Sequence, residues 1–139
     1  MWVKVCGSIL FGLILIVLIM DLLVIDSVYD STGRAIEHSI DAGIVRSGIV
    51  TDAQQGKVQL EENALRSSTR EAFRVALSLN SSLENPVMKN SQFELQLRYD
   101  ADEVPWIDVV FRTHVSFALP GVQYPVTIHR NIPYESVFK

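Results

Sequence analysis

The hydrophobic residues of this chain follow three patterns, and the first of them predicts a membrane anchor. Sixteen residues from Val5 to Met20 carry no charge, and a second apolar run covers residues 22–25. Read from Trp2, this segment gives about 20 residues of helix, or roughly 30 Å, which matches the hydrocarbon core of a bilayer. No polar face at helical spacing interrupts residues 9–20, as a soluble core helix would require. The pattern therefore predicts one transmembrane anchor over residues 1–26.

A cleaved secretory signal is the competing interpretation of this segment. Signals carry an apolar stretch of about 7 to 15 residues followed by small residues at the cleavage point. The stretch here is longer, and residues 26–30 (DSVYD) offer no small-x-small pair. Lys4 precedes the run, whereas Asp21, Asp26 and Asp30 follow it. The positive-inside bias then predicts a single-pass cell-membrane protein with a cytoplasmic N-terminus and an extracytoplasmic domain over residues 27–139.

The second pattern is helical and continues beyond the anchor. Apolar residues recur at spacings of seven, four and four residues at Tyr29, Ile36, Ile40 and Ile44. This stripe predicts a helix over about residues 27–47 that stops at Ser47-Gly48. A second amphipathic helix is predicted over about residues 51–80, with Thr51 or Asp52 as its N-cap. Gly33 and Gly43 each weaken the first helix by about 1 kcal/mol relative to Ala, so we expect bending or fraying at these two positions.

The third pattern has a period of two residues and predicts strands. Hydrophobic and polar residues alternate over about residues 92–99, 106–119 and 124–130. Such alternation is typical of antiparallel strands with one buried face. Residues 100–105 and the pair Pro120-Gly121 predict the two connections. Pro125 cannot donate a ladder hydrogen bond, which places the third strand at an edge.

These elements together predict an α+β fold. It comprises an N-terminal transmembrane helix that continues as an amphipathic helix, a second helix, and a small antiparallel sheet of about three strands. A sheet of this size cannot bury its apolar face alone, so we expect the second helix to cover it. At 139 residues, the chain has room for one anchor and one domain of about a hundred residues.

Charge and cysteine content narrow the range of functions. The formal charge is −4 and the basic residues are scattered singly, which argues against nucleic acid as a partner. The single cysteine, Cys6, lies at the start of the apolar run, so no intramolecular disulfide or thiolate metal site is predicted. Palmitoylation of Cys6 is an alternative to a passive apolar role.

Candidate catalytic chemistry is sparse. The three histidines His38, His114 and His129 are isolated in the sequence, although the last two share the polar face of neighbouring strands. No third ligand lies at a diagnostic spacing, so we predict no metal site and no cofactor. Asp100, Asp102 and Glu103 form a tight acidic group that is most simply a solvated turn. None of the common nucleophile, zinc-protease or phosphate-loop motifs occurs, and we do not expect an enzyme.

Asp21 is a charged residue that lies between the two apolar runs of the predicted anchor. In one interpretation it reaches the headgroup region at the end of the helix. In the other it lies within the membrane and pairs with a cation, as intramembrane acids usually do. Lys4 of the same chain is too distant for this role, but Lys4 or the amino terminus of a neighbouring chain displaced along the axis could supply the cation.

The layout resembles that of pilins and pseudopilins, and more narrowly the TadE-like family of tight-adherence pilus proteins. The resemblance covers most of the chain at the level of pattern. It rests on the anchor, the helix Arg34–Gly48 (RAIEHSIDAGIVRSG), the second helix, and the strand Val109–Pro120 that ends in Pro-Gly. It implies a non-enzymatic envelope component of a pilus or secretion apparatus that assembles through its N-terminal helix.

One position departs from the pilin pattern. Pilin precursors carry Gly before the apolar stretch and Glu five residues after the cut. Gly7-Ser8 fits the first requirement, but the corresponding residue here is Gly12. This favours an uncleaved minor component or a membrane-retained assembly factor.

Two hypotheses about function follow. The first is a pilin-like structural or assembly protein that forms homo- or hetero-oligomers with other pilin-like subunits or envelope-machine proteins. Its predicted helix–helix assembly residues are Lys4, Asp21, Tyr29, Ile36, Ile40 and Ile44. We expect sister subunits to bury the isoleucine stripe, since a lone helix stripe outside the membrane has nothing to pack on. The alternative is a monomeric, membrane-tethered binding or accessory domain for a transporter, receptor or conjugation machine.

Overall fold

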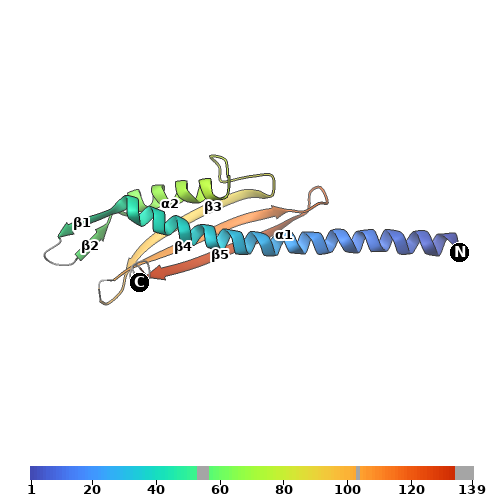
Figure 1. The fold of residues 1–139 in the computed structure, drawn as a ribbon, viewed down its shortest axis with the longest axis horizontal. Coiled ribbons are helices and arrows are strands. Elements are labelled where there is room, and N and C mark those ends of the chain that lie inside the picture. Colours follow the sequence, from blue (N-terminus) through green and yellow to red (C-terminus); the bar gives the residue numbers. More distant parts are fainter. Residues whose placement is uncertain (53–56, 103, 134–139) are drawn as a thin grey trace.

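A single helix runs through the first third of the chain and connects its two parts. The computed structural model describes residues 1–52, 57–102 and 104–133, with residues 47–52 and 57–60 described by their backbone only. Helix α1 extends without interruption over Trp2–Ser47, so the predicted anchor and the predicted helix over 27–47 form one element. Its N-terminal half projects alone, while its C-terminal half lies along the domain (Figure 1). The predicted stop at Ser47-Gly48 is confirmed.

The domain contains an antiparallel meander of three strands. Strands β3 (Met88–Tyr99), β4 (Pro105–Ser116) and β5 (Gln123–Pro133) are paired in the order β3-β4-β5. Phe111 of the central strand lies opposite Phe93 on one side and Ile128 on the other. The predicted sheet is therefore confirmed, and β5 with its Pro125 is an edge strand, as expected.

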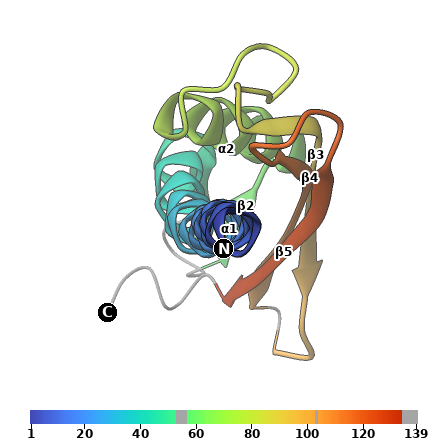
Figure 2. The same cartoon turned by 90° about the vertical axis from the view of Figure 1, so that its right-hand side faces the viewer.

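Two helices cover one face of this sheet. Helix α2 (Glu62–Ala76) packs along α1, and the two lie side by side against the concave face of the sheet (Figure 2). The second helix covers the sheet as expected, and α1 shares that role through its contacts with β5. The fold is α+β in two layers, helices on sheet.

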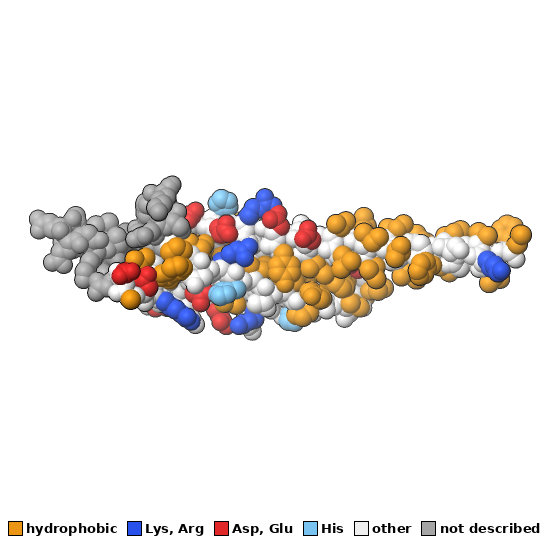
Figure 3. All heavy atoms as spheres, turned by 90° about the horizontal axis from the view of Figure 1, so that it is seen from below, with side chains coloured by type: hydrophobic (Ala, Val, Ile, Leu, Met, Phe, Trp, Pro, Cys, Tyr) orange, Lys and Arg blue, Asp and Glu red, His pale blue; other side chains and the backbone are white. Residues whose placement is uncertain are grey.

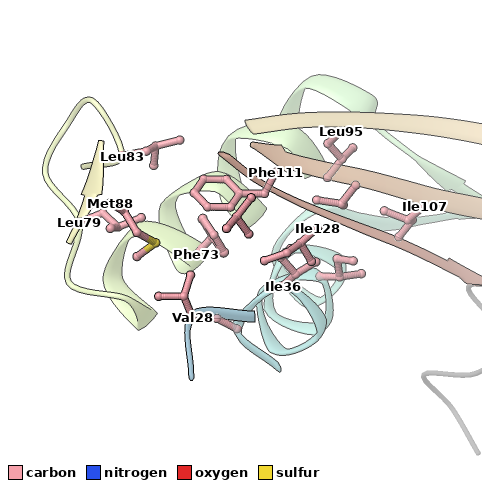
Figure 4. Close-up of a cluster of buried hydrophobic side chains, with 14 of the residues drawn as sticks. Val28, Ile36, Phe73, Leu79, Leu83, Met88, Leu95, Ile107, Phe111 and Ile128 are labelled. Atoms are coloured by element: carbon pink, nitrogen blue, oxygen red, sulfur yellow. The ribbon is translucent and has the colours of Figure 1, made fainter. Parts of the chain in front are cut away.

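The core lies between these layers and draws on every one of these elements. Phe73 of α2 is fully buried and contacts the ring of Phe111 edge-on, with a centroid separation of 4.8 Å. Phe93 lies against the same ring of Phe73 at 5.3 Å. Ile36 of α1 and Ile128 of β5 close the cluster on the other side (Figure 4). Each fully buried side chain of this size contributes about 1.5–3 kcal/mol relative to exposure.

The limits of the second helix differ from the prediction. Residues 48–60 contain a two-stranded antiparallel hairpin, β1 (Gly48–Asp52) and β2 (Lys57–Leu60), in place of the first turns of the helix. Residues 53–56 of the predicted helix lie outside the described residues. Thr51 and Asp52 are strand residues, and the helix N-cap is Glu61, whose side chain makes no capping bond. The helix also ends at Ala76, before its predicted end at about residue 80, and β3 begins at Met88, before the predicted strand over about 92–99.

Gly33 and Gly43 of α1 allow close approach of neighbouring side chains, and the helix is continuous through both positions. A Cβ atom on Gly43 would lie 2.1 Å from Oγ1 of Thr69 on α2. A Cβ atom on Gly33 would lie 2.5 Å from Nη2 of Arg130 on β5. The expected bending at these positions is therefore replaced by tight contacts.

Candidate functional site: the exposed helix and its junction with the domain

The N-terminal half of α1, residues 2–24, is mostly apolar, and we refer to it as the rod. Its large hydrophobic side chains from Trp2 to Val24 are exposed, and the rod is apolar over most of its length in Figure 3. Lys4 lies near the N-terminal end of this half, and Asp21 lies near the end that meets the domain. By length and composition, α1 is the one candidate membrane span among the described residues. The chain thus has a single apolar N-terminal helix that is suited to one membrane crossing.

Asp21 contacts a part of its own chain that is distant in sequence. The backbone N–H of Ala118 donates a hydrogen bond to its Oδ1 at 3.1 Å. Ala118 belongs to the connection between β4 and β5, so a carboxylate on the rod fixes the tip of a hairpin of the domain. The side chain of Asp21 is half-buried as a result. Neither sequence interpretation of Asp21, headgroup contact or pairing with a cation of a neighbouring chain, included this acceptor role.

An apolar groove runs between the rod and this hairpin tip. We refer to it as the helix–loop groove; its walls are Leu13, Val17 and Leu18 on α1 and Phe117, Leu119 and Val122 on the connection. Asp21 lies at its end nearest the domain. A second apolar groove lies at the same junction, between Val24 and Val28 of α1 and Leu77 and Val87 of the segment that joins α2 to β3.

The connection between β4 and β5 is a tight turn of defined type. The N–H of Val122 donates to the carbonyl of Leu119 at 3.2 Å, with Pro120 and Gly121 between them. Gly121 has φ of +80°, which a type II turn requires at this position and which Gly adopts without strain. The predicted Pro-Gly turn is confirmed, and its backbone conformation sets the direction of the residues at the apolar tip.

The isoleucine stripe lies inside the domain. Ile36 and Ile40 have no exposed surface and Ile44 has 2%, because α2 and the sheet of the same chain cover them. The expectation that sister subunits bury this stripe is therefore wrong: the stripe already has a partner within the chain. The sequence shows the stripe but gives no direct sign of its partner, which depends on how α1 crosses the domain.

The remaining predicted assembly residues are accessible. Lys4 is exposed beside Val5, Ser8 and Ile9. Tyr29 retains 41% of its surface, just beyond the apolar rod on the domain side. With Trp2 at the other end, the rod is bracketed by aromatic residues, as is usual at the two interfaces of a bilayer.

The described residues contain no group of three or more His, Cys, Asp and Glu side chains that could hold a metal ion. His114 and His129 share the outer face of the sheet, but they lie opposite Pro125 and Val110 respectively, four positions apart along the strand pair. His129 instead contacts the carboxylate of Asp108 on the neighbouring strand.

The acidic turn is explained by its own hydrogen bonds. Asp100 accepts the backbone N–H groups of Val104 and Asp102 and the indole N–H of Trp106. These bonds, led by that from Val104, lower the pKa of Asp100 below its usual value. Glu103 lies outside the described residues. The carboxylate therefore organises a turn, which matches the simplest sequence interpretation.

The structure adds one segment that sequence reasoning overlooked, the tip Phe117–Val122. The signal was present in the composition: six successive residues (FALPGV) include no polar or charged side chain, although hairpin connections are normally polar. Residues 117–119 were instead predicted as the end of the strand over 106–119, but β4 ends at Ser116 and these residues belong to the connection.

No protein-family model, curated protein or solved structure matches this chain. The resemblance to TadE-like proteins therefore rests on the pattern of elements alone.

Proposed function

We propose that this chain is a non-enzymatic, pilin-like structural or assembly component of a cell-envelope pilus or secretion apparatus. The observation that carries the proposal is the division of α1 into two halves. One half is an exposed apolar rod, and the other is the buried spine of an α+β domain. A rigid helix shared in this way couples any packing between rods directly to the arrangement of the domains.

The surface through which the chain assembles is the rod, because the isoleucine stripe is already covered. In a bilayer, helix association depends on close packing and is favoured by small residues. The rod offers Cys6, Gly7 and Ser8 together, with Gly12 one turn further along. A Cβ atom on Gly7 or Gly12 would meet nothing within 4 Å, so both positions are open to a neighbouring helix.

Charge supports a topology with the domain outside the cell. Lys4 stands at the free end of the rod, and Asp26 and Asp30 follow it on the domain side. The positive-inside bias places Lys4 in the cytoplasm. A maleimide that cannot cross membranes should label a cysteine at the exposed Ser67 of α2 in intact cells, in a Cys6→Ala background. Labelling only after the cells are broken would reverse the topology.

Disulfide crosslinking in membranes tests assembly through the rod. Single cysteines are placed in turn at residues 9–16 in the Cys6→Ala background, and oxidised dimers are quantified. Packed rods should give dimer yields that rise and fall with a period of about 3.6 residues. A cysteine at Ser67 is the matched control and should give no dimer.

The same experiment distinguishes the second candidate function. The burial of Ile36 and Ile40 within the chain supports this second candidate, a monomeric tethered domain, because the stripe is already covered by the same chain. If no position from 9 to 16 crosslinks in chains that are fully inserted, the assembly proposal fails and the tethered accessory domain replaces it.

A further inference from the structure

The hairpin tip Phe117–Val122 exposes large hydrophobic side chains. Leu119 retains 61% of its surface and Val122 retains 43%. Both side chains keep much of their surface exposed even though they face the groove beside α1, and the segment around them has no polar side chain. A contiguous exposed patch of this kind marks a contact with a partner or a membrane.

The position of the tip along α1 sets its depth relative to a bilayer. Twenty residues after Lys4, about 30 Å of helix, end at Val24. Asp21, which holds the N–H of Ala118, is three residues or about 4–5 Å inside that end. When the rod spans the membrane, the tip is therefore level with the outer part of the hydrocarbon on the domain side.

Most backbone N–H groups of the tip already have acceptors within the chain, as hydrocarbon requires. The N–H of Phe117 donates to the carbonyl of Val122 at 3.0 Å, and the N–H of Val122 donates to Leu119. Pro120 has no N–H, and the N–H of Ala118 is taken by Asp21. An unpaired N–H in hydrocarbon costs several kcal/mol, so these pairings remove most of the penalty of insertion.

Aromatic side chains stand at the base of the tip. Phe117 and Tyr124 are stacked with centroids 6.4 Å apart, and Tyr124 is 46% exposed. Tyrosine is enriched at the level of the headgroups, where its ring contacts hydrocarbon and its hydroxyl contacts water. The order from the tip inward to the domain is thus apolar, aromatic and then polar, as the order of a bilayer surface requires.

We propose that the β4–β5 tip inserts into the membrane leaflet on the domain side, with lipid acyl chains filling the helix–loop groove. Lipid is the occupant that the geometry favours, because one wall of the groove is the membrane span itself and the apolar surface of the span continues onto the tip. The chain would then hold the bilayer at two points, and its domain would have a fixed tilt and rotation on the membrane. The proposal rests on α1 as a membrane span and does not depend on assembly.

Fluorescence quenching by spin-labelled lipid tests the insertion. An environment-sensitive fluorophore is attached to a cysteine at Leu119 in the Cys6→Ala background, and the full chain is placed in phosphatidylcholine nanodiscs at one copy per disc. Ala101, exposed in the connection at the other end of the sheet, is the matched control site. Phosphatidylcholine with a spin label on its acyl chain should quench the Leu119 probe several-fold more strongly than the Ala101 probe.

Two further measurements make the result decisive. Val122→Asp places a charge in the tip, and it should lower quenching at Leu119 to the level at Ala101 while leaving the rod inserted. Equal quenching at the two sites in the parent chain would overturn the proposal. The proposal would also be overturned if the emission of the Leu119 probe indicated water at one copy per disc and an apolar environment only at two copies. That result would show that a second chain, not lipid, fills the groove. If the Leu119 probe is quenched but no position in the scan of residues 9–16 forms a crosslink, membrane insertion of the tip is supported and assembly through the rod is rejected.

Discussion

Two glycines in the same helix should respond oppositely to the same substitution. At Gly33, a new Cβ atom meets the guanidinium end of Arg130, a long and partly exposed side chain that can move aside. At Gly43, it meets Thr69, whose Oγ1, Cβ and backbone nitrogen lie 2.1, 3.2 and 3.3 Å away. Thr69 is fully buried between the two helices, and its backbone cannot move without α2.

The magnitudes follow from three opposing contributions. Ala in place of Gly within a helix gains about 1 kcal/mol. At Gly33, displacement of Arg130 loses an exposed ion pair with Glu37, worth less than about 1 kcal/mol, so the net change is a gain of about 0–1 kcal/mol. At Gly43, overpacking of a buried contact costs up to about 3 kcal/mol, which leaves a net loss of about 2 kcal/mol. The two variants should therefore differ by about 2–3 kcal/mol.

Urea unfolding of the full chain in detergent measures this difference. Trp106 of β4 reports on the domain when Trp2 is replaced by Phe, so the rod does not contribute to the signal. Thr69→Ala removes the atom nearest to the new Cβ and should recover part of the loss in the Gly43→Ala chain. If Gly33→Ala and Gly43→Ala shift the midpoint in the same direction by similar amounts, the packing of α1 on α2 described above is wrong.

Two further predictions concern the sheet and its acidic turn. Phe111→Ala should destabilise the domain by about 3–5 kcal/mol, because the side chain is fully buried. Arg112→Ala, on the exposed face, should change the free energy of unfolding by less than about 1 kcal/mol. Urea unfolding of both variants measures the two changes. The lowered pKa of Asp100 means that its ionised form stabilises the fold above about pH 3.8 and that this contribution is lost as the pH falls through the lower folded-state pKa. Asp100→Asn cannot ionise, so its unfolding midpoint should fall less than that of the parent chain between about pH 5 and about pH 3.

The elements that sequence alone predicted well are those with long, regular periodicity. The burial of side chains in β4 alternates over its whole length, and its buried residues include those of the predicted apolar face, Phe111 among them. The rod was equally clear, since the uninterrupted apolar run predicted a helix without a polar face, and α1 is such a helix over residues 2–24. In both segments the local pattern and the final environment agree, so no knowledge of distant contacts was needed.

The region between the helices shows the limit of local reasoning. Thr51 and Asp52 are good helix caps by type, and residues 48–60 contain no strong strand alternation. Here β1 and β2 pair with each other, and Glu61 starts α2 without a side-chain cap. Nothing in the periodicity distinguishes an early helix start from a short hairpin.

The candidate site was only partly visible for a related reason. The stripe at Ile36, Ile40 and Ile44 was read correctly as one helix face, but the periodicity of a helix does not show what packs against it. The partner proved to be α2 and the sheet of the same chain. Likewise, the acceptor role of Asp21 depends on Ala118, which is 97 residues away.

Asp21 connects the two proposals and limits how they combine. An acid in the apolar run needs a donor, and in this fold the N–H of Ala118 on the same chain is one. That bond fixes the hairpin tip against one face of the rod, the face that carries Leu13 and Val17. If lipid fills the groove on that face, helix-to-helix assembly must use the remaining faces, so crosslinking at Leu13 should be weak even where other positions of the scan give dimers. A crosslinking maximum at Leu13 would instead require the tip to leave the rod, and with it the bond to Asp21.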